Sequence, residues 1–186
     1  MHIDIIETLP SLAKLEDNWN AVYDADDEAQ VFLSWQWLSG WLSCIEGPWF
    51  VLAAKAGEAA DLPYVAFLPL RLQTKVEKSD VISDMRMAGN YAADYTGIIC
   101  RPEAENKVIP AFARTIKQMN WARLNLENVR MSERRARLLL ACFPKASFNA
   151  TEVDRVNKVD GIDNGVCPYL PLPKDWNGYL DSLSAN

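Results

Sequence analysis

The sequence predicts a mixed α+β domain in which a mostly antiparallel sheet is flanked by helices. Two apolar runs, residues 49–54 and 63–74, follow each other across the turn at residues 56–61, which is typical of a β-hairpin. Apolar residues at helical spacing occupy segments before and after this hairpin. Adjacent strands combined with later helices that cross over indicate the α+β class and not a doubly wound nucleotide-binding fold.

The first part of the chain divides into one strand and two helices. Residues 2–8 alternate like a strand, and residues 10–22 have one apolar helical face made of Leu12, Leu15, Trp19 and Val22. Ser34 is a good N-cap for a second helix that reaches about residue 46 and ends at Gly47 and Pro48. The acidic segment 24–28 lacks the spacing of a calcium loop, and we expect it to be a solvated turn.

The second part alternates strands with helices. Expected strands are residues 84–88, 95–100, 121–129 and 147–159, with a short extended piece at 169–172. Expected helices begin at residues 101–103, after Ser132 and at residue 174.

Composition excludes several classes of protein. The chain has 186 residues, of which 49% are hydrophobic and 24% charged, and this favours one globular domain with a proper core. Its net charge of -6 and the lack of a basic patch argue against nucleic-acid binding. No apolar run is long enough for a transmembrane helix, and the N-terminus does not resemble a signal peptide. We therefore expect a cytoplasmic protein.

Histidine and cysteine content restricts the chemistry further. His2 is the only histidine, so Ser-His-Asp and Cys-His catalysis and multi-histidine metal sites are not expected. No Gly-x-Ser-x-Gly motif is present, which also argues against a hydrolase. The four cysteines form no C-x-x-C pair, and we expect reduced thiols and no metal site: Cys44, Cys100, Cys142 and Cys167.

Five segments, taken together, carry a resemblance to a known family. In chain order they are Phe-Leu-Ser-Trp-Gln-Trp-Leu-Ser-Gly-Trp at 32–41, the strand pair 51–54 and 64–70 ending in Pro-Leu, the Asp-Tyr loop at 90–95, Trp-Ala-Arg-Leu-Asn-Leu at 121–126, and Pro-Tyr-Leu-Pro-Leu at 168–172. Their order and spacing resemble the CelD-like, also called BioF2-like, acetyltransferases, which are relatives of the FemAB aminoacyltransferases within the GNAT superfamily. The resemblance covers nearly the whole chain.

The resemblance implies a GNAT-like (acyl-CoA N-acyltransferase-like) fold and a protein of two GNAT-like halves. This chain resembles the N-terminal half, with residues 1–173 as its domain and residues 174–186 as the start of the segment that leads to a missing second half. The implied function is the acceptor side of acyl transfer from acyl-CoA to an amine or hydroxyl, on a small molecule or a cell-envelope polysaccharide precursor. The fragment alone is expected to be inactive, and an apolar surface left by the missing half would favour a homodimer.

Acetyl-CoA or another acyl-CoA is expected only in the full-length protein. GNAT diphosphate-binding loops read Arg/Gln-x-x-Gly-x-Gly/Ala, and the nearest match here is residues 86–91. Tyr91 stands where the motif needs a small residue, and a strand, not a helix, is expected to follow. We therefore expect an ordinary turn and no cofactor site in this fragment.

Candidate site residues come from the Asp-Tyr loop and the first tryptophan-rich helix. The candidates for acceptor binding are Asn90, Asp94, Tyr95, Trp35 and Trp37. Asp94 is the candidate carboxylate that takes a proton from the acceptor, and its alternative role is to hold backbone amides in the turn.

The remaining candidates each have an ordinary structural alternative. Trp37 and Trp41 share a helix face and serve either core packing or a platform for a sugar or peptide, and core packing is favoured for Trp41. Trp35 points elsewhere; core packing is favoured less clearly for it, with a surface position beside the N-cap as the alternative. Glu127 is a base or a solvated strand residue. The arginines at 134, 135 and 137 form a solvated helix face, with an anionic acceptor as the alternative.

A second function remains open beside acyl transfer. The lack of a complete cofactor motif also fits a non-catalytic binding or interaction module with a degenerate GNAT fold. The residues do not identify the acceptor, the acyl group, the catalytic base or the oligomeric state.

Overall fold

A computed structural model of the chain describes residues 1–59, 61–151 and 172–183. The chain divides into two compact units, Met1–Asn149 and Ala150–Asn186. The larger unit contains the sheet and every candidate site residue, and it is described first.

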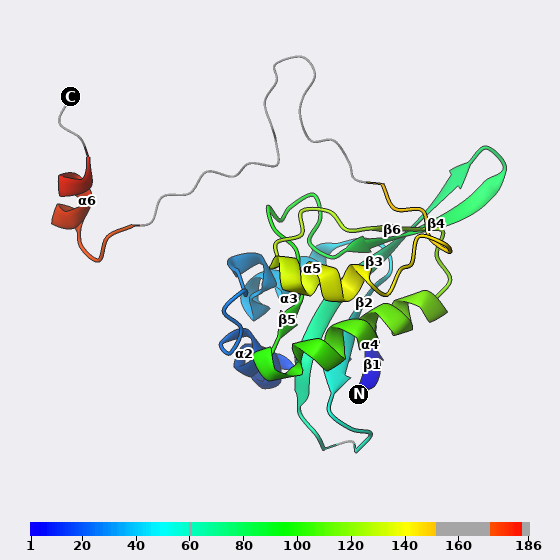
Figure 1. Cartoon of the computed structure of the whole chain (residues 1–186), viewed down its shortest axis with the longest axis horizontal. Coiled ribbons are helices and arrows are strands. Elements are labelled where there is room, and N and C mark those ends of the chain that lie inside the picture. The colour runs from blue at the N-terminus through cyan, green and yellow to red at the C-terminus, as the bar shows by residue number, and fades with distance from the viewer. Residues whose placement is uncertain (60, 152–171, 184–186) are drawn as a thin grey trace, which may run out of the picture. The chain divides into compact units, whose positions relative to one another are not determined.

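The described residues of the larger unit form a six-stranded sheet in the order β1-β2-β3-β4-β6, with β5 beside β3 (Figure 1). All neighbouring strands are antiparallel except β4 and β6, which are parallel. The strands are β1 (His2–Ile6), β2 (Trp49–Lys55), β3 (Tyr64–Glu77), β4 (Asp80–Met87), β5 (Ile99–Cys100) and β6 (Arg123–Asn125). The α+β class and the mostly antiparallel sheet are confirmed.

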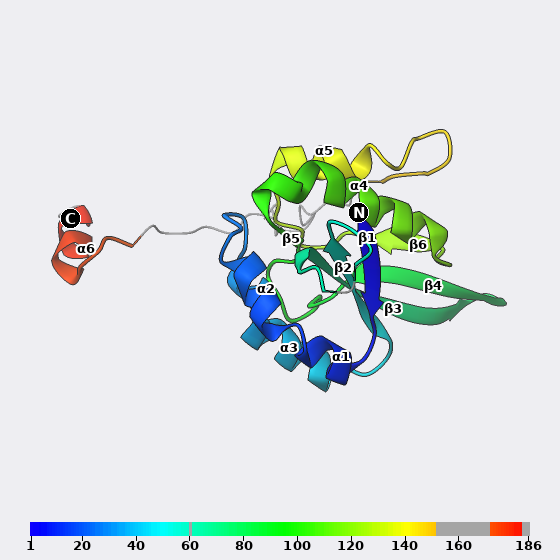
Figure 2. The same ribbon diagram turned by 90° about the horizontal axis from the view of Figure 1, so that it is seen from below.

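Helices cover both faces of this sheet, as Figure 2 shows. One face packs against α1 (Leu9–Ala13), α2 (Glu16–Tyr23), η1 (Val31–Leu33) and α3 (Trp35–Cys44). The other face packs against α4 (Glu105–Gln118), which follows η2 (Pro102–Ala104), and against α5 (Glu133–Leu140). Each interface has its own apolar core, and alternate residues of the central strands supply both cores.

The predicted helix starts agree well with the structure. The Ser34 hydroxyl accepts a hydrogen bond from the Trp37 amide at the start of α3, and Ser132 does the same for Arg135 in α5. The single helix expected over residues 10–22 is wrong, because the chain breaks at Lys14 into α1 and α2. Its apolar face is nevertheless confirmed, since Leu12, Leu15, Trp19 and Val22 are all buried.

Two predicted strands are shorter in the structure. Of the strand expected over 121–129, only β6 forms. Its pairing with β4 ends at Asn125, whose partner is Arg86. The strand expected over 95–100 is reduced to β5, with an isolated bridge between Thr96 and Val129. Residues 147–151 form no strand, and the rest of the strand expected there, like most of the piece at 169–172, lies outside the described residues.

A buried ion cluster corrects two predictions. Arg135 was expected on a solvated helix face, yet its side chain is 2% exposed and hydrogen-bonds to Asp26 and Glu105. Asp26 belongs to the acidic segment expected to be solvated, and its carboxylate also accepts hydrogen bonds from the backbone amides of Glu28 and Cys100. A buried arginine needs carboxylate partners, and this loop and the first turn of α4 provide them. Arg134 reaches Glu105 from the exposed side.

The smaller unit contains α6 (Trp176–Ser182), which confirms the helix expected from residue 174. Asp175 is its N-cap and accepts a hydrogen bond from the Gly178 amide at 2.8 Å. Within the described parts of both units, no helix has the length and apolar character needed to cross a membrane.

Candidate functional site

The loop after β4, residues 88–95, contains three of the predicted acceptor-binding residues. It is fixed to the segment that follows β6: the Thr96 amide donates to the Asn128 carbonyl at 2.7 Å, and the Asn128 side chain donates to the Ala93 carbonyl at 3.3 Å. The Gln30 side chain, next to η1, donates to the Tyr95 carbonyl at 3.2 Å. The loop is therefore held by segments from both sides of the sheet.

The amides of this loop do not fit a diphosphate. The Ala92 and Ala93 amides both donate to the Gly89 carbonyl, the Ala88 amide donates to Pro69, and the Tyr91 amide donates to the Asn90 side chain. A diphosphate cradle requires amides that are free to point at the ligand. Tyr91, whose φ is +77°, occupies the position that the motif reserves for a small residue. Within the motif at residues 86–91, the Ala88 and Tyr91 amides are thus engaged by the protein itself.

Trp37 lies directly against this loop. A Cβ atom added to Gly89, which has φ +92°, would lie 3.2 Å from Cζ3 of the Trp37 indole. Phe32 packs edge-on to Trp37 with ring centroids 5.1 Å apart, and Tyr95 lies 6.3 Å from Phe32. The guanidinium of Arg130 lies over the Tyr95 ring at 5.0 Å. We call this partly exposed row, Trp37, Phe32, Tyr95 and Arg130, the aromatic row.

The other two tryptophans of α3 behave differently. Trp41 stacks on Trp37 with an interplanar angle of 10° and is partly buried, so the expected shared face is confirmed. Trp35 takes the core-packing alternative and not the candidate acceptor-binding role: it is 8% exposed and packs edge-on against Trp19. Its position as the first residue of α3 points its ring inward, toward the sheet. Trp35 is separated from solvent and does not join the aromatic row.

Asn90 and Glu127 form a polar cluster beside the loop. Asn90 is 6% exposed, and its side chain donates to Glu127, which also accepts two hydrogen bonds from Nη1 of Arg86 at 3.0 and 3.1 Å. The same Arg86 nitrogen donates to the Tyr91 hydroxyl at 2.9 Å. Glu127 is therefore not a simple solvated strand residue. Its carboxylate is engaged by the side chains of Arg86 and Asn90.

Asp94 is exposed at the end of the same loop. Among the described residues it makes no hydrogen bond or ion pair, so the alternative role of holding turn amides falls to Asn90 instead. An exposed carboxylate without a cationic partner is free to contact a ligand amine. The structure thus places Asn90, Asp94, Tyr95 and Trp37 around one loop and leaves only Trp35 apart.

Sequence reasoning missed several members of this neighbourhood. Phe32 lies in the tryptophan-rich segment but was not considered separately, and Arg86 was judged only as part of a phosphate motif. The sequence offered one usable signal, since Arg71 follows the apolar run of β3 and Arg86 stands between Met85 and Met87 in β4.

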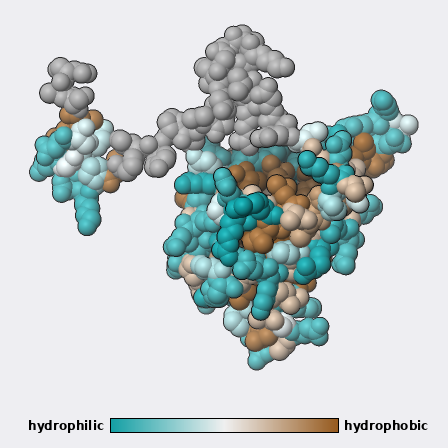
Figure 3. Space-filling model, viewed as in Figure 1, coloured by the Kyte–Doolittle hydropathy of each residue, from teal (hydrophilic) through white to brown (hydrophobic). Residues whose placement is uncertain are grey.

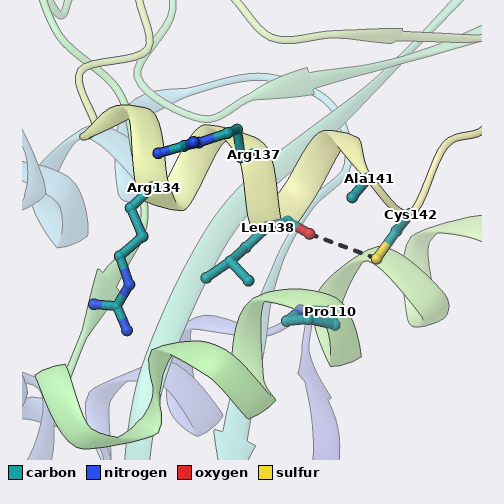
Figure 4. Close-up of a pocket in the computed structure, with 6 residues that line it drawn as sticks. All are labelled: Pro110, Arg134, Arg137, Leu138, Ala141 and Cys142. Carbon is teal, nitrogen blue, oxygen red and sulfur yellow. Dashed lines mark hydrogen bonds between the residues drawn. The ribbon is translucent and has the colours of Figure 1, made fainter.

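A groove between α4 and α5 lies on the other face of the sheet. Hydrophobic side chains gather near α5 in the space-filling view, with hydrophilic ones at their border (Figure 3). Figure 4 shows Leu138 of α5 pointing toward Pro110 of α4, with the two arginines at the rim. The groove is lined by Pro110, Arg134, Arg137, Leu138, Ala141 and Cys142. It contains no carboxylate, hydroxyl or imidazole that would carry acid–base chemistry.

Metal-ligand side chains do not gather in the part of the chain that the structure describes: no group of three or more His, Cys, Asp or Glu residues there is arranged to hold a metal ion.

Comparison with known proteins gives a likeness of fold only. No family model matches the sequence, and no curated protein matches it. The aminoglycoside 6'-N-acetyltransferase AAC(6')-Ih from Acinetobacter baumannii is similar to this chain with a TM-score of 0.45 and 11% identity, over 82% of this chain and 97% of the other.

Two further solved structures show the same level of likeness. The ribosomal-protein-alanine N-acetyltransferase from Brucella melitensis biovar Abortus 2308 has a TM-score of 0.41 and 14% identity, over 82% of this chain and 98% of its own. The integron cassette protein VCH_CASS6 from V. cholerae has a TM-score of 0.36 and 15% identity, over 98% of this chain and 99% of its own. At such low scores these likenesses carry no argument, and the proposals below rest on the residues of this chain.

Proposed function

We propose that this chain is the acceptor-side half of a GNAT-type acyltransferase, and that a second half binds the acyl-CoA. The observation that carries the proposal is the closed loop after β4. Its amides at Ala88, Tyr91, Ala92 and Ala93 donate within the protein, while its side chains Asp94 and Tyr95 remain toward the surface. A loop with these amides engaged is better suited to contact an acceptor than to hold a diphosphate.

The order of the elements supports the same proposal. The parallel pair β4 and β6 is connected through α4, and the loop after β4 lies at the end where their pairing stops. The resemblance of the sequence to CelD-like acetyltransferases extends over these same elements. Under this proposal the acceptor is a small molecule or a glycan precursor of the cell envelope that presents an amine or a hydroxyl.

Each residue near the loop has a physical role in this proposal. The aromatic row offers ring faces on which a sugar or another flat polar group can stack. Asp94 is the carboxylate that receives the proton when the acceptor amine becomes a nucleophile, since it has no cationic partner among the described residues. Glu127 holds the side chains of Asn90 and Arg86 in place.

A titration of the chain with acetyl-CoA tests the cofactor part of the proposal. We expect no binding heat from residues 1–186, and tight binding would overturn the assignment to the acceptor side.

A fluorescence titration with glucosamine tests the acceptor part. Glucosamine should quench tryptophan emission in the wild type and in Trp176→Phe, whose indole lies in the other unit. It should not do so in Trp37→Phe. Glucose serves as the uncharged comparison. Equal quenching in both variants would exclude the aromatic row as the acceptor surface.

A non-catalytic binding module is the second candidate. The observation that favours it is the compensation of Glu127 by Arg86, which leaves Asp94 as the one carboxylate without a partner around the loop. If the chain combined with a second half gives no acyl transfer while glucosamine still quenches the wild type and not Trp37→Phe, the binding module becomes the better description.

A further inference from the structure

Two arginines stand directly opposite each other on the face of the sheet that α3 covers in part. Arg71 of β3 and Arg86 of β4 are partners in the antiparallel register. Directly opposed residues point to the same side, and like charges in this position destabilise the pair. Arg71 lies on the same side as Phe67, which packs in the core beneath α2 and α3, because four residues separate them along the strand.

The two arginines differ in their partners. Arg86 is bound by Glu127 and the Tyr91 hydroxyl. Within the described ranges, Arg71 has no side-chain hydrogen bond and no ion pair. The Nε atoms of both arginines are buried without an acceptor. A buried donor without a partner costs about 1–3 kcal/mol, so this arrangement is unfavourable in the isolated chain.

The surrounding charges do not compensate Arg71. Its neighbours on this face form a continuous set of ion pairs that includes Asp84, which is 1% exposed. These ion pairs join three cations to three carboxylates: Lys75, Arg86 and Arg123, with Glu77, Asp84 and Glu127. Among the described residues, Arg71 takes part in none of them and has no carboxylate partner.

We propose that Arg71 and Arg86 bind one oxyanion, a phosphate or carboxylate carried by the acceptor. The oxyanion supplies the missing negative charge, and the planar guanidinium of Arg71 suits such a group because it donates two parallel hydrogen bonds. Arg86 connects this position to the acceptor loop through Tyr91, and Trp49 is the partner of Arg71 in β2, which places an aromatic residue beside it. This inference rests on the proposed function, since it takes the loop 88–95 as the acceptor side.

The sequence alternative of an anion site on α5 does not compete with this position. Arg134 and Arg135 are engaged by Glu105, and Arg137 donates to the Glu133 carbonyl of its own helix. Of the arginines compared in the described residues, Arg71 is the one whose side chain has no hydrogen-bonding partner, and it lies on the sheet.

Calorimetric titration of the full chain at low salt tests the site, with glucose 1-phosphate, glucuronate, glucose and inorganic phosphate as the probes. We expect the wild type to bind the first two and not glucose. Arg71→Gln should weaken binding about tenfold or more, because a charged hydrogen bond contributes about 1.5–3 kcal/mol. Arg114→Gln, which removes an exposed arginine of α4, is the matched control and should bind like the wild type.

Two additional measurements keep the result interpretable. Arg71→Gln should unfold at an equal or higher temperature than the wild type, because it removes an uncompensated charge, so lost binding would not mean lost folding. Arg71→Lys keeps the charge without the planar fork and should bind with intermediate affinity.

Three outcomes would contradict the inference. They are equal binding by Arg71→Gln and the wild type, no binding by either charged sugar, and inorganic phosphate binding as tightly as glucose 1-phosphate, which would show an ion site unrelated to an acceptor. No acyl-CoA enters the experiment, so its failure leaves the acyl-transfer proposal to be decided by the acetyl-CoA and glucosamine titrations.

Discussion

Arg135 and Asp26 lie 109 positions apart in the sequence and form a buried ion pair with two hydrogen bonds, of 2.8 and 3.0 Å. The pair joins α5 to the segment between α2 and η1, and Glu105 extends it to the first turn of α4. Burial opposes the charge on Arg135, but the hydrogen bonds from its guanidinium to Asp26 and Glu105 outweigh that effect and raise its pKa. Three segments that are distant in the sequence therefore depend on one side chain.

We predict that Arg135→Met lowers the free energy of unfolding by about 3–5 kcal/mol, because it leaves the buried Asp26 without its cationic partner and Glu105 with Arg134 alone. Arg137→Met, two residues along the same helix and exposed, should change it by no more than about 0.5 kcal/mol. Urea unfolding followed by circular dichroism measures both. Similar values for the two variants would show that the buried pair contributes little.

Two glycines should respond oppositely to alanine. Gly89→Ala adds a Cβ at φ +92° and 3.2 Å from Trp37, and it should cost about 1–3 kcal/mol. Gly40→Ala, in the exposed interior of α3 with nothing within 4 Å, should stabilise the protein by about 0.5–1 kcal/mol. Thermal unfolding of the two variants side by side gives the signs, and a stabilising Gly89→Ala would mean that the loop is not fixed against Trp37.

Tyr64 should titrate abnormally. Burial and its hydrogen bond to Asp4 raise the pKa of Tyr64 to about 12. Because the folded pKa lies above the ordinary value of 10.0, the stability that this contact adds is complete below pH 10 and is lost as the pH rises toward 12. Asp4→Asn should return the pKa toward 10, as measured by phenolate absorbance against Tyr64→Phe. An unchanged titration in Asp4→Asn would leave burial as the only cause.

The cysteines that the structure describes should differ in reactivity. Burial raises the pKa of the Cys100 thiol to about 12, although the nearby Arg135 opposes this, and the side chain is buried. Cys44 is exposed. Iodoacetamide at pH 8 followed by peptide mass spectrometry should modify Cys44 in the native protein and Cys100 only after unfolding. Rapid native labelling of Cys100 would indicate that β5 opens easily.

Local signals in the sequence predicted the local structure. Ser34 and Ser132 begin helices because a hydroxyl can accept from an amide three residues later, and this needs no information about the rest of the fold. The hairpin of β2 and β3 was also predicted from a local signal, namely two apolar runs separated by a short turn. Even the residues of the loop 88–95 were identified as a group, because they are neighbours in the chain.

Contacts over long sequence distances were not predictable in the same way. The segment around Asp26 looks like a solvated acidic turn until Arg135 is placed beside it, and Arg135 looks like one of several surface arginines. The choice between a core and a surface position for Trp35 stayed open because its environment depends on Trp19 in another helix. Arg71 and Arg86 became neighbours only through the register of two strands.

The length of β3 has one further consequence. This strand contacts β2, β4 and β5, and its alternate residues enter opposite cores, with Phe67 on one side and Leu68 on the other. Deleting a single residue near its middle would exchange inside for outside on both faces at once and would separate Arg71 from Arg86. The tip at Lys78 and Ser79 lies beyond these contacts, so the same deletion there would alter only the turn. Evolution can therefore lengthen or shorten this hairpin at its end far more easily than along its stem.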